Sequence, residues 1–241
     1  MARKLVFAAP LLFLLALPAP PSFAAGQSPT GKSATSDKLQ QVLQQLDGSA
    51  AKFRSASADF EEKDIQTVPV PNTDTRTGTI YFEHRGGEVR MAAHVKQFNG
   101  QPNGSVYTYT HGVFQLFDPQ QNQVTKVQNS GNLAGYLSLG FGATGKDLQD
   151  KFEITYLGQE TVDGVKTDKL QLIPKDQKAR NLFSKVTIWI DPARNVNLKQ
   201  VFDEGQGLSR VCTYSNIQMN HSISSSEFSF KTNKKTQFTT Q

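Results

Sequence analysis

Cysteine is almost absent from this sequence: Cys212 is the only one in 241 residues. A lone cysteine cannot form an internal disulfide, and no cysteine near the N-terminus is available to carry a lipid. We therefore expect a chain that is held together by its core and is not itself a lipoprotein. Because Cys212 has no neighbouring base in sequence, a buried structural thiol is a better interpretation than a nucleophile.

The sequence also has little that is arranged for chemistry. It contains no Gly-x-Ser-x-Gly elbow, no phosphate-binding glycine loop and no His-Glu-x-x-His motif. None of the four histidines has a partner at zinc-ligand spacing; they are His84, His94, His111 and His221. Asp59, Glu61 and Glu62 are acidic neighbours, but a strand edge that faces water explains them more simply than an acid–base pair. We predict no catalytic residue, no metal and no cofactor, and keep a hydrolase as the enzymatic alternative.

Long apolar runs are missing except for one near the N-terminus. Two basic residues precede an apolar run over residues 5–17, and Ser22-Phe23-Ala24 offers the small residues of a cleavage site. A membrane anchor needs about 20 unbroken apolar residues, whereas prolines end this run early. We interpret residues 1–24 as a secretory signal peptide and predict a periplasmic protein.

Charge of one sign does not dominate the chain. The formal net charge is +5, and both signs are interspersed. This is not the clustered basic stripe of a nucleic-acid-binding protein, and it allows only weak attraction to anionic membranes. The length suits one domain. We expect a flexible leader over residues 25–35, a single domain over residues 36–230 and a polar tail over residues 231–241.

The hydrophobic periodicity predicts one amphipathic helix followed by many strands. Ser36-Asp37 can cap a helix whose apolar residues recur at helical spacing. From Ser55 the period changes to two and gives about ten or eleven short strands without helical crossovers, which predicts antiparallel pairing. The clearest hairpin covers residues 78–98, with Gly86-Gly87 in the turn.

Residues 131–151 interrupt this pattern. Their large apolar side chains would share one helical face, but Gly135, Gly140, Gly142 and Gly145 each cost about 1 kcal/mol in a helix interior. Two interpretations remain: a mobile flap, or a glycine-rich loop packed as core. A short helix over residues 147–152 is expected to follow.

The order of several short motifs resembles the periplasmic lipoprotein carrier family, LolA. After the first helix come Ser57-Ala58-Asp59-Phe60, Gly78-Thr79-Ile80-Tyr81-Phe82 and Phe117-Asp118-Pro119. Leu172-Ile173-Pro174-Lys175, Gln200-Val201-Phe202 and Phe228-Ser229-Phe230 follow in the same order, so the resemblance covers most of the mature chain.

The resemblance implies a mainly β (α+β) fold. It would be a strongly curved, incomplete antiparallel β-barrel of about eleven strands, covered by the N-terminal amphipathic helix and short lid helices. Arg85, at the end of a strand, matches an arginine that holds the lid closed in the family; a solvated turn arginine is the alternative. The residues that would form the acyl cavity and lid are Ile80, Phe82, Arg85, Val89, Met91, Phe114, Leu116, Leu133, Tyr136, Leu137, Phe141 and Ile188.

The function that the resemblance implies is that of a monomeric carrier and chaperone in outer membrane biogenesis. It would shield the acyl chains of lipoproteins in a hydrophobic cavity and shuttle them from the inner to the outer membrane. The expected partners are an inner-membrane ATP-driven release complex and an outer-membrane receptor, with no nucleic acid. A carrier or sensor of free lipid or glycolipid on the same fold is the alternative.

Overall fold

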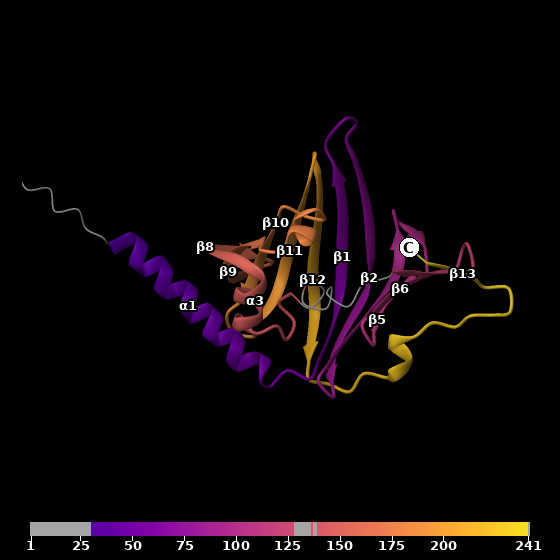
Figure 1. The fold of residues 1–241 in the computed structure, drawn as a ribbon, viewed down its shortest axis with the longest axis horizontal. Helices are drawn as coiled ribbons and strands as arrows, with labels where there is room; N and C mark the ends of the chain where they lie inside the picture. The colour runs from indigo at the N-terminus through magenta and orange to yellow at the C-terminus, as the bar shows by residue number, and fades with distance from the viewer. Residues whose placement is uncertain (1–29, 128–135, 137–138, 241) are drawn as a thin grey trace, which may run out of the picture.

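The computed structural model describes residues 30–127, 136 and 139–240, and the side chains from residue 35 onward (Figure 1). The predicted signal peptide, Leu133 and Leu137 lie outside the described residues. The helices are α1 (Thr30–Ala50), α3 (Gly145–Lys151) and α4 (Gln177–Arg180), with a 3₁₀ turn at Ser225–Phe228. The strands are β1 (Ser55–Gln66), β2 (Asn72–Arg85), β3 (Glu88–Phe98), β4 (Gln101–Pro102), β5 (Val106–Thr110), β6 (Val113–Asp118), β7 (Gln123–Val127), β8 (Phe152–Val162), β9 (Val165–Pro174), β10 (Lys185–Asp191), β11 (Val196–Gly205), β12 (Leu208–Met219) and β13 (Gln237–Thr240).

All strands of the described residues belong to one open sheet. Its order is β13-β7-β6-β5-β3-β2-β1-β12-β11-β10-β9-β8, with β4 paired to β3. Two antiparallel meanders are therefore joined where β1 pairs with β12. The prediction of a mainly β, strongly curved and incomplete antiparallel barrel is confirmed, although it contains thirteen strands rather than about eleven.

Bulges and a tight turn shape this sheet. Gly86 and Gly87 have φ values of 60° and 81°, so the predicted β2–β3 turn is confirmed, and both residues use the left-handed conformation that glycine allows. Register shifts lie between Ser57 and Asp59, between Thr77 and Gly78, and between Trp189 and Ile190. Because a bulge bends its strand and increases local twist, these shifts favour the curvature of the sheet.

Helix α1 begins at Thr30, earlier than the cap predicted at Ser36. Its apolar stripe of Val42, Leu43 and Leu46 is almost fully buried against α3 and the β8–β10 part of the sheet. A polar contact adds to this packing: Lys38 Nζ lies 3.4 Å from Asp168 Oδ2, and the Asp168 side chain is only 1% exposed. The expected covering helix is therefore docked on one half of the sheet.

The described part of the glycine-rich segment is packed as core. Leu139 and Phe141 are each 1% exposed, and the Phe141 ring stacks on Phe82 with centroids 4.6 Å apart. Gly145 approaches α1 so closely that an added Cβ would lie 2.4 Å from the Leu43 carbonyl oxygen. For residues 139–145 the flap interpretation was wrong and the packed loop is correct.

The C-terminal residues differ from the sequence-based expectation. Phe228 ends a 3₁₀ turn instead of lying in an edge strand, and it covers Arg90, whose guanidinium carbon lies 4.2 Å from the Phe228 ring centroid. Within the region expected as a polar tail, Gln237–Thr240 forms β13, which pairs in parallel with β7. Apolar periodicity did not reveal β13, because it is held mainly by ladder hydrogen bonds and threonine contacts such as Thr125–Thr239.

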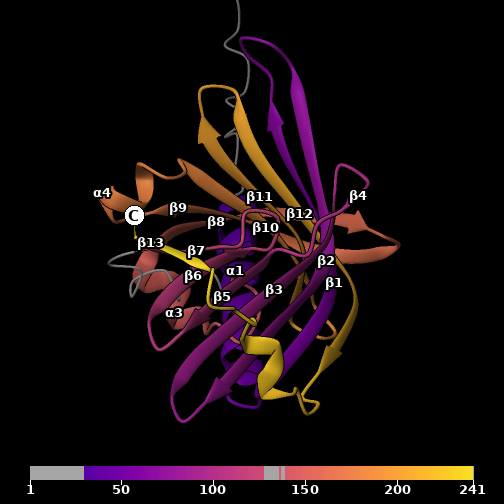
Figure 2. The ribbon, with the colours of Figure 1, turned by 90° about the vertical axis from the view of Figure 1, so that its right-hand side faces the viewer.

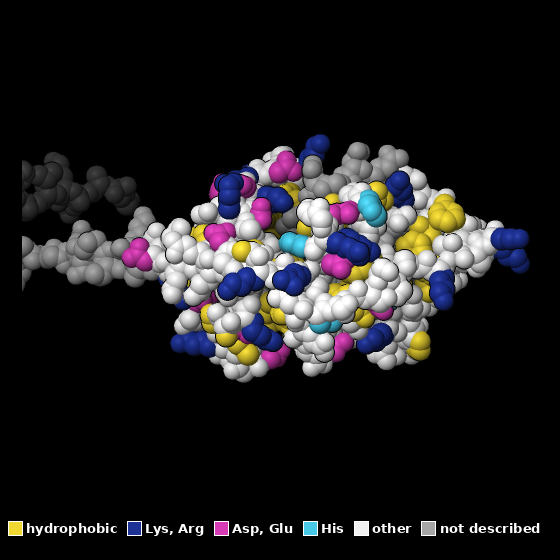
Figure 3. All heavy atoms as spheres, turned by 90° about the horizontal axis from the view of Figure 1, so that it is seen from below, with side chains coloured by type: hydrophobic (Ala, Val, Ile, Leu, Met, Phe, Trp, Pro, Cys, Tyr) yellow, Lys and Arg dark blue, Asp and Glu magenta, His cyan; other side chains and the backbone are white. Residues whose placement is uncertain are grey.

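Positive and negative side chains alternate over the face of the molecule shown in Figure 3. This agrees with the interspersed charges of the sequence. None of the described helices combines the length and apolarity needed to cross a membrane.

Candidate functional site

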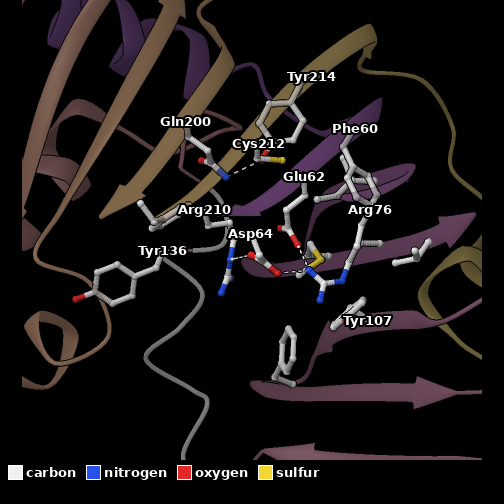
Figure 4. A pocket seen from close by; sticks show the side chains of 16 residues that line it. Phe60, Glu62, Asp64, Arg76, Tyr107, Tyr136, Gln200, Arg210, Cys212 and Tyr214 are labelled. Carbon is white, nitrogen blue, oxygen red and sulfur yellow. Dashed lines mark hydrogen bonds and ion pairs between the residues drawn. The ribbon is translucent and has the colours of Figure 1, made fainter. Parts of the chain in front are cut away.

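A cavity of about 290 Å³ lies on the concave face of the sheet, between the two meanders (Figure 4). It is partly enclosed, and its wall is apolar on one side and charged on the other. The lining residues are Phe60, Glu62, Asp64, Arg76, Ile80, Met91, Ala93, Val95, Tyr107, Phe114, Tyr136, Gln200, Phe202, Arg210, Cys212 and Tyr214.

Strand register explains why these residues meet. Directly opposed residues of neighbouring strands point to the same face of a sheet. Ile188 is opposite Gln200, Gln200 is opposite Cys212, Cys212 is opposite Glu62, and Glu62 is opposite Arg76. This row crosses the sheet from the part under α1 to the cavity, so α1 and the cavity lie on the same face.

The apolar wall consists mainly of β2 and β3 residues with contributions from β5 and β6. Ile80 is opposite Ala93, and Phe82 is opposite Met91. Phe82 is 1% exposed because the Phe141 ring stacks on it, whereas Ile80 and Ala93 are only partly buried and border the open space. This wall is thus a continuous apolar surface, and it faces the open space of the cavity.

The charged wall is a four-residue network (Figure 4). Arg76 Nη1 donates to Glu62 Oε1 at 3.1 Å and to Asp64 Oδ2. Arg210 Nε donates to Asp64 Oδ1 at 3.1 Å. Asp64 therefore bridges two guanidinium groups, and we call Glu62, Asp64, Arg76 and Arg210 the charged cluster.

Burial changes the titration of Glu62. Desolvation raises its pKa above the ordinary value, and the negative charge of Asp64 acts in the same direction, while Arg210 and Arg76 oppose both. The folded protein therefore binds the Glu62 proton more tightly than the unfolded chain does. This carboxyl contributes stability below its ordinary pKa of about 4.5, and the contribution is lost as the pH rises through the raised pKa.

We expect Glu62→Gln to gain stability relative to the wild type as the pH rises from about 4 to about 7, because glutamine has no proton to lose. Urea unfolding of both proteins across this range measures the difference. Glu61→Gln is the matched control, since Glu61 is exposed and belongs to the alternate set of β1 residues. A stability difference between Glu62→Gln and the wild type that does not change with pH would contradict this assignment.

Cys212 is buried in the cavity wall, as expected from the sequence. Desolvation raises its pKa from the ordinary 9.0 to about 12, although a hydrogen bond with Tyr214 acts in the opposite direction. Burial also raises the pKa of Tyr214 well above its usual range. Both groups are neutral at physiological pH, so they extend the uncharged part of the wall.

At about pH 8, a polar thiol reagent should modify Cys212 in the folded protein about a thousandfold more slowly than in the unfolded chain. Burial raises the pKa of the thiol from 9.0 to about 12, which lowers the thiolate population by about that factor. Timed labelling with and without denaturant, read by mass spectrometry, measures both rates. Similar rates would mean that water reaches Cys212 in the native state.

The predicted cavity residues are distributed over several depths. Ile80, Met91, Phe114 and Tyr136 line the cavity. Phe82, Phe141 and Ile188 are nearly fully buried in the adjoining core. Val89 and Leu116 lie on the same sheet face, half-buried, outside the cavity lining.

Arg85 is on the other face of β2. His84 is opposite Val89 and shares the concave face with it. Because neighbouring residues of a strand point to opposite faces, the Arg85 side chain lies on the convex face, as does Glu83. It is exposed and forms no hydrogen bond or ion pair with the described part of the chain. Its role in holding a lid remains a prediction.

The charged cluster was not predicted from the sequence. We expected Glu62 to face water with Asp59 and Glu61, but Glu62 faces the cavity. The signal was present in the alternation of β1: Ala56, Ala58 and Phe60 form its buried set, and Glu62 and Asp64 continue that set at the same period. Within the described ranges, no group of three or more His, Cys, Asp or Glu side chains is suited to hold a metal ion.

The described residues thus form an open, curved, mainly β fold with a half-apolar cavity on its concave face. The chain belongs to a protein family whose model, described only as an uncharacterized protein, matches residues 114–241. It is also 29% identical over 117 residues to an uncharacterized protein of Methanocaldococcus jannaschii. That match covers 48% of this chain and spans only 32% of the relative's length.

Solved structures share the fold at low sequence identity. An uncharacterized conserved protein from Thermus thermophilus has a TM-score of 0.53 at 10% identity, with 85% of this chain and 99% of that chain covered. A LolA superfamily protein from Nitrosomonas europaea has a TM-score of 0.41 at 15% identity, with 80% and 97% covered. The Mycobacterium tuberculosis lipoprotein LppX has a TM-score of 0.44 at 15% identity, with 78% and 98% covered. The open half-barrel that the sequence resemblance implied is the fold that the sheet order of this protein shows.

Proposed function

We propose that this protein is a periplasmic carrier that shields the acyl chains of lipoproteins and moves them from the inner to the outer membrane, without chemistry of its own. The observation that carries the proposal is the cavity, where Ile80, Met91 and Phe114 border open space instead of packing against a second layer. Exposing an acyl chain of about sixteen carbons to water costs on the order of 12 kcal/mol. Transport across an aqueous compartment therefore needs an apolar shelter of this kind.

The size of the cavity suits an unloaded carrier. Its volume of about 290 Å³ lies just below the range for ligand pockets, about 300–1,000 Å³. A lipoprotein with several acyl chains would require the cavity to widen. The sheet edges at β13 and β8 are not paired with each other, so the half-barrel can open without breaking hydrogen bonds between strands.

The proposed carrier is a monomer with two docking partners. An inner-membrane ATP-driven complex would load it, and an outer-membrane receptor would accept the cargo. A signal peptide over residues 1–24 would export the chain to the compartment between these partners.

The charged cluster favours a second candidate, a carrier or sensor of free lipid or glycolipid. Arg76 and Arg210 border the same cavity as the apolar wall, so a ligand there meets hydrogen-bonding groups as well as hydrocarbon. A free amphiphile with a polar headgroup would satisfy both halves of the wall, whereas acyl chains alone would use only the apolar half.

Native mass spectrometry separates these functions. The mature protein would be purified from the periplasm without detergent after co-expression with an abundant lipoprotein. A one-to-one complex with a triacylated lipoprotein is the expected result. Adducts the size of a phospholipid or glycolipid alone would favour the second candidate, and a chain without any adduct would contradict both.

A further inference from the structure

Exposed apolar side chains gather at the ends of two neighbouring hairpins, which project from the body of the molecule (Figure 2). Of the six large hydrophobic side chains exposed in the described residues, three lie there: Val68 is 55% exposed, Val70 68% and Leu208 40%. Pro69 and Pro71 complete the surface. We call these five residues the apolar tip.

The apolar tip is a connected structure rather than two separate loops. The β1–β12 ladder continues to the pair of Gln66 and Leu208. Beyond it, the Thr67 backbone N–H donates to the Gly207 carbonyl at 2.8 Å, and the Thr67 hydroxyl donates to the same oxygen at 3.0 Å. The two hairpin ends therefore present their apolar side chains together.

The chemistry of the apolar tip fits an apolar medium. No charged residue occurs in residues 65–73 or 205–209. Pro69 and Pro71 have no N–H group, the Thr67 N–H is bonded, and the Val70 carbonyl accepts from the Gln66 side chain at 3.2 Å. Unbonded backbone groups make irregular chain costly in the hydrocarbon core of a bilayer. The other backbone groups of residues 67–71 keep their water if the tip stays in the hydrated interfacial region.

The apolar tip stands beside the charged end of the cavity. Asp64 is two residues from Gln66 on β1, and Arg210 is two residues from Leu208 on β12. Arg76 on β2 completes that end of the wall. A surface that binds the apolar tip therefore lies close to the charged end of the cavity.

We propose that the apolar tip docks the protein on the interfacial region of a lipid bilayer. A bilayer interface accepts uncharged valine, leucine and proline without requiring directional hydrogen bonds, which matches the exposed apolar side chains of the tip. Docking brings the charged cluster to the level of lipid headgroups. The inference does not depend on which cargo the cavity carries.

Vesicle flotation tests the proposal. The mature protein, purified from the periplasm without detergent, is mixed with vesicles of phosphatidylethanolamine and phosphatidylglycerol. Val70→Asp should weaken binding about tenfold or more, because a carboxylate would have to enter the interface. Phe238→Asp is the matched control, since Phe238 is 68% exposed like Val70 but lies on β13 at an edge of the sheet, six strands away from β1, and it should bind like the wild type. Equal binding by Val70→Asp and the wild type, or no binding by the wild type, would overturn the proposal.

A second measurement locates the contact. An environment-sensitive fluorophore on Val70→Cys should shift to shorter wavelength when vesicles are added, while the same label on Phe238→Cys should not. Cys212 is buried and does not compete for the label. If the label at position 70 responds to a periplasmic protein and not to vesicles, the apolar tip is a protein-docking surface and the bilayer proposal is wrong. Neither result requires cargo, so the carrier proposal stands or falls separately.

Discussion

Replacing Gly140 by alanine should lower the free energy of unfolding by about 3 kcal/mol or more, combining left-handed strain with overpacking. Gly140 has a φ of +77°, and a Cβ built there lies 2.2 Å from the Asn197 Cβ. Asn197 has no room to move, because it is fully buried and its backbone N–H donates to the Gly140 carbonyl at 3.1 Å. Its side-chain oxygen also accepts from the Trp189 backbone at 3.2 Å.

The control for this prediction is Gly164→Ala. Gly164 has a nearly equal φ of +79°, but nothing lies within 4 Å of a Cβ built on it. This substitution should cost only the strain of the left-handed backbone, about 1–2 kcal/mol. Urea unfolding monitored by circular dichroism measures both variants. Equal losses at the two positions would mean that the contact with Asn197 contributes nothing.

Gly140 also illustrates why the sequence left two interpretations open for residues 131–151. Glycine is used where a backbone is loose and also where two elements approach too closely for a side chain. Only the position of Asn197 decides between these uses, and that contact joins residues that are far apart in sequence. The packing of Phe141 on Phe82 and Tyr214 was equally invisible in a one-dimensional pattern.

Alternation along a strand predicts which face a side chain uses but not how deeply it is buried. Ile80 and Phe82 were both assigned to the inner face of the same strand, and the structure agrees. How deeply a side chain is buried depends on what packs over it. Phe141 packs over Phe82, whereas Ile80 borders the cavity. Val89 and Leu116 show the same limit, because they lie on the predicted face but outside the cavity lining.

Alternation along β1 indicates which face Glu62 and Asp64 use, but the partners of these carboxylates in the charged cluster could not be predicted from the sequence. Glu62 is directly opposite Arg76, and Asp64 is directly opposite Arg210. The second pair joins residues 146 positions apart, and its existence depends on the register of the first and last long strands of the barrel. A shift of one residue would place these charges on the other face. Periodicity within one strand cannot provide that register.

Ile80→Asp should weaken the binding of an acyl ligand about a hundredfold or more, since an ionised carboxylate would lie against hydrocarbon in the cavity. Ile80 is a suitable position because it is partly buried at the edge of the core and borders the open space. Displacement of a fluorescent fatty-acid probe measures the affinity, and thermal unfolding checks that the fold remains.

Val89→Asp is the matched control, because Val89 lies on the same sheet face as Met91 but outside the cavity lining. It should bind the probe like the wild type. If both variants lose binding equally, acyl chains extend along the whole face toward the β2–β3 turn, and the cavity is only the part of the binding surface that is open without cargo. If neither variant changes the affinity, the acyl chains bind elsewhere and the carrier proposal loses its site.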